Sequence, residues 1–281
     1  MDSSKIKSIA FDLDGTALDS KGRLSNRLVT ALLQLSRSGL CLIACTSRPL
    51  DKALPALRPL MSEAASLKYI IFLGGCGIHD TQTGKCIFFD KLNPSDIGII
   101  AKDFQRFDYF AYTKDRCIKM KSENDFAFPK KIKQLTKFLL KRGESAFYNR
   151  SKFVNRKISK EAYKISSFHI PSEEKIRQFR AALPSSNVFI NVNELEITNI
   201  NVNKFYAMRY LEKQSAINLN ETIFFGDSEN DVMCLQKIPF SVAMKNATPQ
   251  ISSFAFSTTR EDNDHDGVGR FLEDNFKSLS E

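Results

Sequence analysis

The 281-residue sequence lacks an apolar run near the roughly eighteen residues that a membrane span requires, and its first residues, MDSSKIKS, lack the apolar region of a signal peptide. Its six cysteines form no CxxC pair, and its three histidines lie far apart in the sequence. Zinc sites and disulfide frameworks usually show closely spaced cysteines or histidines, so neither is indicated. We therefore expect a cytoplasmic protein with reduced thiols, no membrane partner and no histidine metal site.

The sequence also lacks a nucleic-acid-binding module, although its net charge is +9. The basic residues are concentrated in residues 130–164, which contain twelve of the 41 Lys and Arg residues and only two acidic ones, Glu144 and Glu161. Such a run is usually a solvated surface, and the alternative is a surface that attracts an anionic substrate. Nucleic-acid binding by this segment is a less favoured reading, and we expect no nucleic-acid partner.

Apolar strands alternate with amphipathic helices at both ends of the chain. The predicted strands lie in IKSIAFDL, LCLIACT, YIIFLG, TIFFGD and FSVAM. The first predicted helix, SNRLVTALLQLSRSG, has Ser25 as its N-cap and Gly39 after its last turn. This alternation predicts an α/β fold with a mostly parallel sheet that helices cover on both faces.

The middle of the chain has a different pattern. GIHDTQTGKCIFFDK predicts a hairpin, and DYFAYTKDRCIKMK predicts a second pair of strands. KKIKQLTKFLLKRG and SEEKIRQFRAAL predict helices. We therefore predict a Rossmann-like core at 1–78 and 195–281, an inserted α+β cap at 79–194, and hinges near 78–82 and 192–200.

Four polar groups follow predicted strands or open a predicted helix. They are Asp12-Leu13-Asp14-Gly15-Thr16, Thr46-Ser47-Arg48-Pro49, Lys204, and GDSEND with Asp227 and Asp231. Ligands of an open parallel sheet bind beyond the carboxyl ends of its strands. Neighbouring carboxylates repel unless one is protonated or a cation lies between them, and carboxylates with a hydroxyl and a lysine suit phosphoryl transfer. The alternative for Asp12 to Gly15 is an ordinary turn.

Four motifs in order resemble those of the haloacid dehalogenase (HAD) superfamily, most closely its Cof-type phosphatases. They are FDLDGT, CTSRP, Lys204 and FGDSENDVMCL, and SVAMKNATPQ and HDGVGRFL resemble the closing segments of the family. The resemblance covers nearly the whole chain. It implies a HAD core with a large cap and Mg²⁺-dependent hydrolysis of small phosphorylated metabolites, phosphosugar-like or nucleotide-like, through an aspartyl phosphate.

The resemblance also implies roles for individual residues. Asp12 would be the nucleophile and Asp14 the general acid and base. The Mg²⁺ ligands would be Asp12, the backbone carbonyl of Asp14, Asp227, and Asp231 as a ligand or an outer partner. The substrate-binding residues would be Thr46, Ser47, Arg48, Lys204 and Asn230. Taken singly, Thr46 could be a strand-end hydroxyl and Lys204 a solvated helix lysine.

Three residues depart from the pattern of the family. Ser47 stands where a glycine is usual, which reduces backbone freedom in the phosphate-binding turn. Gly74 stands where an asparagine is common, and Lys245 replaces a common glycine near the mouth of the site. The last two affect substrate recognition more than chemistry.

Two other functions remain open. One is a phosphomutase or a phosphosugar-specific relative, and the other is a non-catalytic protein that binds a phosphorylated ligand on the same fold. A dehalogenase is disfavoured because that chemistry does not require an acid at Asp14. The sequence predicts neither the physiological substrate nor the oligomeric state.

Overall fold

The structure is a computed structural model that describes residues 3–61, 67–103, 109–114, 117–120, 161–191 and 194–276. The chain divides into a core unit, Met1–Phe89 with Val202–Glu281, and an insert unit, Asp90–Asn201. It passes between them at 89/90 and 201/202. The predicted helix KKIKQLTKFLLKRG and nearly all of the basic segment lie outside the described residues.

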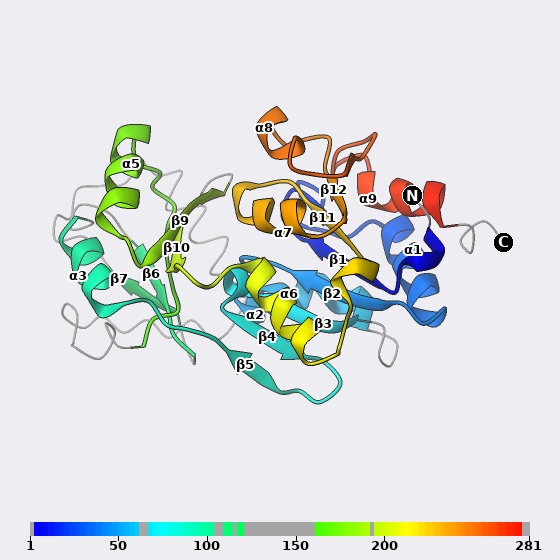
Figure 1. Ribbon diagram of the computed structural model, residues 1–281, viewed down its shortest axis with the longest axis horizontal. Coiled ribbons are helices and arrows are strands. Elements are labelled where there is room, and N and C mark those ends of the chain that lie inside the picture. Colours follow the sequence, from blue (N-terminus) through cyan, green and yellow to red (C-terminus); the bar gives the residue numbers. More distant parts are fainter. Residues whose placement is uncertain are drawn as a thin grey trace. The chain divides into compact units, whose positions relative to one another are not determined.

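An eight-stranded sheet forms the centre of the core unit, in the order β13-β12-β11-β1-β2-β3-β4-β5 (Figure 1). Its strands are β1 (Ser8–Asp12), β2 (Cys41–Cys45), β3 (Leu67–Phe72), β4 (Gly77–Asp80), β5 (Cys86–Phe88), β11 (Thr222–Gly226), β12 (Phe240–Ala243) and β13 (Ser257–Thr258). The strands from β13 to β3 are parallel, and β1 lies between β11 and β2. Every residue of β1 is buried, as expected for a strand covered on both faces.

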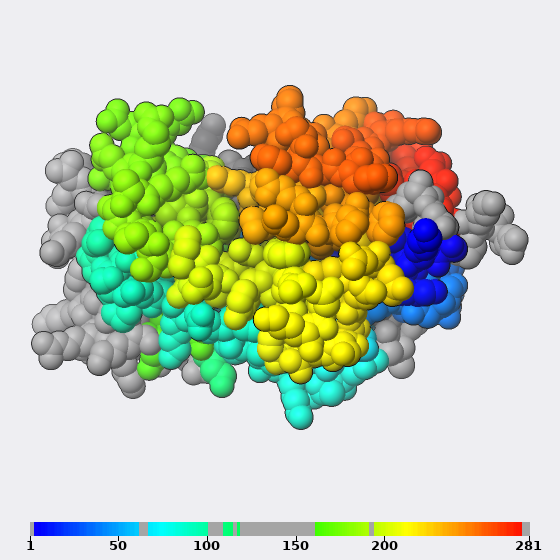
Figure 2. All heavy atoms as spheres, in the orientation of Figure 1, coloured from blue at the N-terminus to red at the C-terminus, as the bar shows by residue number. Residues whose placement is uncertain are grey.

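Helices cover both faces of this sheet. They are α1 (Asn26–Arg37), α2 (Leu50–Leu57), α6 (Lys204–Lys213), α7 (Val232–Lys237), α8 (Pro249–Ser252) and α9 (Gly267–Asn275). Ala207 of α6 and Leu235 of α7 share a buried cluster with Ala10 of β1, and Figure 2 shows the surface over these helices in yellow and orange. On the other face, the ring of Phe271 in α9 lies 5.4 Å from that of Phe225 in β11. The predicted α/β fold with a mostly parallel sheet is confirmed.

Local sequence signals set the ends of α1 as predicted. The Ser25 hydroxyl accepts a hydrogen bond from the Leu28 N–H at 3.0 Å, which satisfies one of the unpaired donors of the first turn. Gly39, just beyond the helix, has φ +95°, a conformation that favours glycine. The helix therefore presents Leu28, Leu32 and Leu35 to the buried side of the unit.

The hairpin of β4 and β5 belongs to the core sheet. Its antiparallel pairing is as the sequence predicts, and β4 also pairs with β3, with Tyr69 opposite Asp80. Of the residues predicted to begin the cap and to form the first hinge, 78–80 therefore lie in β4, which has a neighbour on each side, and 81–82 lie in the turn after it. The turn chemistry of DTQTG identifies a hairpin but contains no information on which sheet its strands join.

The insert unit contains a five-stranded antiparallel sheet in the order β7-β6-β8-β10-β9. Its elements are α3 (Pro94–Asp103), β6 (Tyr109–Tyr112), β7 (Cys117–Met120), β8 (Lys164–Ser167), α5 (Glu173–Ala182), β9 (Ser186–Asn191) and β10 (Glu194–Asn199). Ile100 of α3 and Phe179 of α5 share an apolar core with Ile165 and Leu195 of the sheet. The predicted α+β character of this region, its second strand pair and its helix SEEKIRQFRAAL are confirmed. Among the described residues, no helix is both long and apolar enough to cross a membrane.

Candidate active site

Three of the predicted polar groups meet at one edge of the core sheet. Asp12 is the last residue of β1, Thr46 follows β2, and Asp227 follows β11. Because these strands are parallel neighbours, their carboxyl ends lie side by side. All three side chains are buried. Burial is uncommon for carboxylates such as Asp12 and Asp227 unless they have a charged partner.

Lys204 supplies the positive charge of this edge. Its Nζ donates to Asp12 Oδ1 at 2.5 Å and to Asp231 Oδ1 at 2.7 Å, and its side chain is 0 % exposed. Burial alone would lower the pKa of Lys204, but the nearby charges of Asp12 and Asp231 raise it well above its ordinary value. Lys204 is therefore a buried cation at neutral pH and not the solvated lysine that its position on a helix would suggest in isolation.

A close approach between two loops holds Lys204 in place. The side chain of Asn203 caps α6 by accepting a hydrogen bond from the Tyr206 N–H at 2.9 Å. Gly75 has φ +104°, and a Cβ atom there would come within 2.2 Å of the Asn203 carbonyl oxygen. Only glycine fits this contact. Sequence reasoning singled out the neighbouring Gly74 and missed Gly75, although the run LGGCG was the available signal.

The carboxylates of Asp12, Asp227 and Asp231 could hold a cation, since one oxygen from each lies within 4.8 Å of the others. Carboxylate oxygens suit a hard divalent ion such as Mg²⁺. The two oxygens of Asp231 are already engaged, Oδ1 by Lys204 and Oδ2 by the backbone N–H groups of Asp227 and Ser228. Asp231 therefore suits the role of an outer partner better than that of a direct ligand.

The acidic cluster has raised pKa values. Burial, followed by the charge of Asp231, raises the pKa of Asp227 to about 7. Burial also raises the pKa of Asp12, against the opposing effect of Lys204. Asp227 accepts a hydrogen bond from the Thr16 hydroxyl at 2.8 Å. Gly15, with φ +81°, passes so close that a Cβ atom would lie 2.4 Å from Asp227 Oδ2. The FDLDGT loop therefore fits against Asp227 only with glycine at this position.

Asp14 lies outside this cluster and pairs with Arg48. The guanidinium of Arg48 donates from Nε to Asp14 Oδ2 at 2.8 Å and from Nη2 to Oδ1 at 2.5 Å. Both groups are partly exposed. This two-point contact is the strongest common form of an arginine–carboxylate pair. The sequence suggested Arg48 as a substrate ligand, and no sequence signal indicated that its partner in the structure would be Asp14.

The turn after β2 is fastened to two other loops. The backbone N–H groups of Leu73 and Gly74 donate to the carbonyl oxygens of Arg48 and Thr46 at 2.9 and 3.0 Å. Asn230 Nδ2 donates to the Ser47 hydroxyl at 2.8 Å. The turn that the sequence assigns to phosphate binding is therefore held by backbone contacts on one side and by a side-chain contact on the other.

Lys245 follows β12 and forms an exposed ion pair with Glu261 at 3.2 Å. Its backbone N–H donates to the Thr259 hydroxyl at 2.9 Å. An exposed pair of this kind contributes little to stability, so its side chain can exchange partners at small cost.

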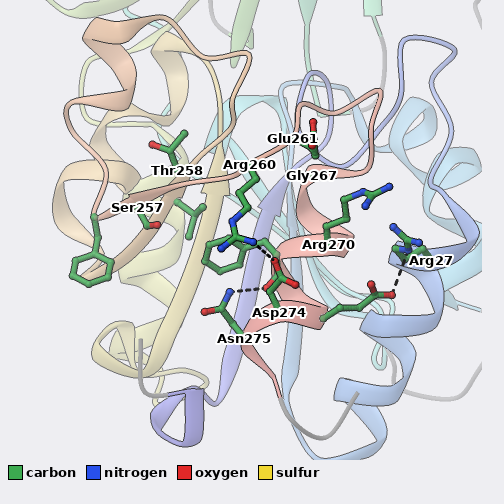
Figure 3. Close-up of a pocket in the computed structure, with 13 residues that line it drawn as sticks. Arg27, Ser257, Thr258, Arg260, Glu261, Gly267, Arg270, Asp274 and Asn275 are labelled. Atoms are coloured by element: carbon green, nitrogen blue, oxygen red, sulfur yellow. Dashed lines mark hydrogen bonds and ion pairs between the residues drawn. The ribbon is translucent and has the colours of Figure 1, made fainter. Parts of the chain in front are cut away.

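A separate pocket of about 600 Å³ lies beside β13 and α9 (Figure 3). Its charged lining consists of Arg27, Arg260, Arg270, Glu261, Glu273 and Asp274. Arg27 lies 3.4 Å from Glu273, and Arg260 lies 3.6 Å from Asp274. Its three acidic and three basic groups give the lining no net charge to attract an anionic ligand, and Asp12 and Lys204 do not line it. The cluster at the edge of the sheet is therefore separate from this pocket.

Comparisons with known proteins agree with this geometry. A family model described as haloacid dehalogenase-like hydrolase matches residues 9–272. A putative phosphatase of Mycoplasma pneumoniae is 24 % identical over 287 residues, or 96 % of this chain and 97 % of the relative. Phosphatase YwpJ of Bacillus subtilis is 25 % identical, with coverage of 95 % and 99 %. A phosphoglycolate phosphatase of Methanobrevibacter smithii is 25 % identical, with coverage of 86 % and 87 %.

Solved structures share the fold. The HAD subclass IIB sugar phosphatase BT4131 matches with a TM-score of 0.79 and 19 % identity, over 95 % of this chain and 98 % of its own. A haloacid dehalogenase-like hydrolase from B. subtilis matches with a TM-score of 0.77 and 24 % identity, over 95 % and 99 %. Both matches extend through the core and the insert units, so the arrangement of the two regions along the chain is common to these proteins.

Proposed function

Because this chain belongs to the haloacid dehalogenase-like hydrolases, we propose that it is a Mg²⁺-dependent phosphatase that cleaves small phosphorylated metabolites through an aspartyl phosphate on Asp12. The predicted membership of the HAD superfamily, among its Cof-type phosphatases, is confirmed. The observation that carries the proposal is the cluster of Asp12, Asp227 and Asp231 around Lys204 at the carboxyl end of β1. Burial of so many carboxylates beside one ammonium has a physical reason when a cation and a phosphoryl group bind there.

The metal would be held by the carboxylates of Asp12 and Asp227 and by the backbone carbonyl of Asp14. Asp231 would orient this set through Lys204 and the backbone at 227–228. The donor atoms of this site are all oxygen, which suits Mg²⁺. The three carboxylates exceed the single charge of Lys204 by two negative charges, which matches a divalent cation. When bound, Mg²⁺ would neutralise charge on the phosphoryl oxygens.

In the first step, a carboxylate oxygen of Asp12 would form a bond to phosphorus while the bond from phosphorus to the leaving oxygen breaks. Lys204 holds the Asp12 carboxylate in place, which limits the freedom that must be lost on the way to the transition state. Asp14, in its protonated form, would give its proton to the leaving oxygen. Thr46 and Lys204 would bind the phosphoryl oxygens.

Asp14 must leave Arg48 to perform this step, because both of its oxygens accept hydrogen bonds from Arg48. A phosphoryl group is a second two-point acceptor for a guanidinium and can take the place of Asp14. In the second step, Asp14 would take a proton from water as the water attacks phosphorus and the bond to Asp12 breaks. One carboxyl group thus serves as acid and then as base.

We also propose that the insert unit recognises the part of the substrate beyond its phosphoryl group. The two passages of the chain, at 89/90 and 201/202, would then be the hinges. We base the proposed substrate classes on the relatives: one relative is named a phosphoglycolate phosphatase, and one structural neighbour is a sugar phosphatase. Phosphosugars, phosphoglycolate and nucleoside monophosphates are therefore the classes to screen first.

The first experiment is a colorimetric assay of the purified full chain with p-nitrophenyl phosphate, with Mg²⁺ and with EDTA, beside D12N. We expect Mg²⁺-dependent turnover that D12N lacks. Borohydride added during turnover would reduce the acyl phosphate at Asp12, and mass spectrometry of the peptide containing Asp12 would detect the product. The same assay is then repeated with the metabolite panel, with and without an acceptor sugar.

Each alternative has its own outcome. Phosphate binding without turnover on any compound would indicate a ligand-binding protein and would overturn the proposal. Transfer to an acceptor sugar with no release of inorganic phosphate would indicate a phosphomutase. Turnover with no trapped Asp12 product, and with D12N still active, would contradict the covalent mechanism.

A further inference from the structure

Two buried side chains join the turn after β2 to the loop after β11. Asn230 Nδ2 donates to the Ser47 hydroxyl at 2.8 Å, although the two residues are 183 positions apart in the chain. Ser47 is 7 % exposed and Asn230 is 4 % exposed. The Ser228 hydroxyl donates to the amide oxygen of Asn230 at 3.0 Å, which fixes the orientation of the amide and directs its NH₂ group at Ser47.

From this contact we infer that Ser47 and Asn230 are positioning residues that hold each other, and that they act on phosphate binding as one unit rather than as two substrate ligands. The inference rests on the proposed phosphatase function, because the two loops joined by Ser47 and Asn230 contain the proposed phosphate-binding and metal-binding residues. Thr46 and Arg48 flank Ser47, and Asp227 and Asp231 are in the loop of Asn230.

The sequence context explains why this device uses a serine. A glycine is usual at position 47 in the resembling family, and a glycine has no side chain that could accept a hydrogen bond. Ser47 does not have a positive φ, so the turn adopts its shape here without the freedom of glycine. The hydroxyl restrains the turn instead, through a hydrogen bond that water reaches poorly and that is correspondingly costly to lose.

The hydrogen bond between Ser47 and Asn230 therefore fixes the distance between the turn at 46–48 and the loop at 227–231. The turn at 46–48 carries the Thr46 hydroxyl that would bind a phosphoryl oxygen, and the loop at 227–231 would hold the proposed metal. A phosphoryl group has to contact both at once, so an error of a fraction of an ångström between them weakens its binding. Loss of either partner in the bond should release the same restraint.

A double-mutant cycle tests this unit. We would measure the Kd of inorganic phosphate in the presence of Mg²⁺, together with KM and kcat, for wild type, S47A, N230A and S47A/N230A. We expect each single variant to weaken phosphate binding and raise KM by about tenfold, and the double variant to show about the same loss. We expect kcat to change less than threefold, because Asp12 and Asp14 keep their own contacts. S47T, which retains the hydroxyl, should recover most of the affinity.

The matched control is S241A. The Ser241 hydroxyl is also buried in the same unit. It donates to the Leu235 carbonyl oxygen at 2.6 Å and accepts from the Phe256 N–H at 3.2 Å, and neither partner belongs to the two loops. S241A should lower the melting temperature of the protein without a change in phosphate affinity. Hydrogen exchange gives a readout without turnover: backbone amides of residues 46–48 and 227–231 should exchange faster in both S47A and N230A, but not in S241A.

The outcomes separate the possibilities. A loss of about a hundredfold in the double variant would show that Ser47 and Asn230 bind phosphate independently, and would overturn the inference. Unchanged phosphate affinity in both single variants would also overturn it and leave the bond a purely structural one. If the wild type neither binds phosphate nor turns over any substrate, the proposed function itself fails, while the exchange experiment still reports whether the bond restrains both loops.

Discussion

Each unit of the molecule buries a lysine against carboxylates, but the charge balance differs between the two. In the insert unit, Lys164 of β8 lies 2.9 Å from Glu196 of β10, and the two side chains are 2 % and 1 % exposed. In the core unit, Lys204 binds Asp12 and Asp231, and Asp227 belongs to the same cluster. Among the described residues, one carboxylate thus pairs with Lys164 in the insert unit, whereas three belong to the cluster of Lys204 in the core unit.

This difference indicates that burial alone does not distinguish a structural ion pair from the cluster proposed as the active site. Lys164 and Glu196 can neutralise each other within their own sheet, and the ring of Tyr112 lies 5.8 Å from the Lys164 ammonium. The core cluster has too few positive charges. Burial and mutual repulsion accordingly raise the pKa of Asp12 and Asp227. The excess of negative charge, rather than the buried lysine, is what points to a bound cation.

The largest expected effect is on turnover. D12N should reduce kcat by at least about a thousandfold, because it removes the nucleophile and one metal ligand without changing the side-chain volume, and D14N should also be severely impaired. D12N should stay close to wild type in stability without Mg²⁺, since it removes a buried carboxylate whose pKa burial raises while Lys204 keeps its contact with Asp231. Steady-state kinetics and thermal melting would check this. A kcat for D12N above about 1 % of the wild-type value would contradict the role of Asp12.

The next effect is on stability, and it tests the two lysines directly. K164M should cost about 3–5 kcal/mol in the free energy of unfolding, because it leaves Glu196 buried without its cation, and K164M/E196L should recover most of this loss. K204M should also destabilise, but no single second substitution should restore it, because three carboxylates remain. Added Mg²⁺ should partly restore K204M and have no effect on K164M beyond its effect on wild type.

Urea unfolding with and without Mg²⁺ would measure these differences. Full recovery of K204M stability in K204M/D12N, without metal, would show that the cluster is an ordinary balanced pair. The comparison between the two units would then fail. Failure of K164M/E196L to recover would instead show that the insert pair has partners beyond its own two charges.

A pH experiment sharpens the same comparison. Burial and Asp231 raise the pKa of Asp227 to about 7, well above the value in an unfolded chain. Between these two pKa values the unfolded chain loses its proton before the folded one does, so this group makes the metal-free protein less stable as the pH rises toward 7. A metal needs the ionised form, and its binding releases the proton. Mg²⁺ affinity should therefore fall about tenfold per pH unit below pH 7 and level off above it.

Calorimetric titration with Mg²⁺ at pH 6, 7 and 8, in buffers of different ionisation enthalpy, would measure both the affinity and the protons released. We expect up to one proton released per ion at pH 6 and fewer at pH 8. D227N should abolish most of the pH dependence together with most of the affinity. Equal affinity at pH 6 and 8 in the wild type would exclude Asp227 as a group that titrates on metal binding.

The strands and the meeting of Asp12, Thr46 and Asp227 could be predicted from the sequence because each depends on a local pattern. A buried apolar run indicates a strand, and parallel neighbours bring the residues that follow them to one edge. The contacts of Arg48 with Asp14, and of Asn230 with Ser47, could not be predicted in this way. They depend on which rotamer each side chain adopts and on how far apart two loops lie, and neither is encoded in a local pattern.

The hairpin strands β4 and β5 illustrate the same limit at the level of the sheet. Alternation and a turn sequence predict a hairpin, but the hairpin joins the core sheet through pairing of β4 with β3. That pairing depends on contacts outside the hairpin itself. The role of Asp231 is a further case: the sequence left open whether it is a metal ligand or an outer partner, and the contacts of both its oxygens with Lys204 and with backbone N–H groups favour the outer partner.

We expect the smallest effect on stability from an exposed ion pair. Arg260 lies 3.6 Å from Asp274 in the pocket beside β13, and the two side chains are 88 % and 56 % exposed. Water screens such a pair, and ordering two long side chains offsets what remains, so R260A should change the free energy of unfolding by less than about 0.5 kcal/mol. KM and kcat should not change, since Arg260 is separate from the Asp12 cluster. Urea unfolding and phosphatase kinetics of R260A beside K164M would measure both. A loss of stability comparable to that of K164M, or a rise in KM, would mean that this pocket takes part in folding or binding. Burial of charge would then not distinguish the two lysine sites from exposed ion pairs.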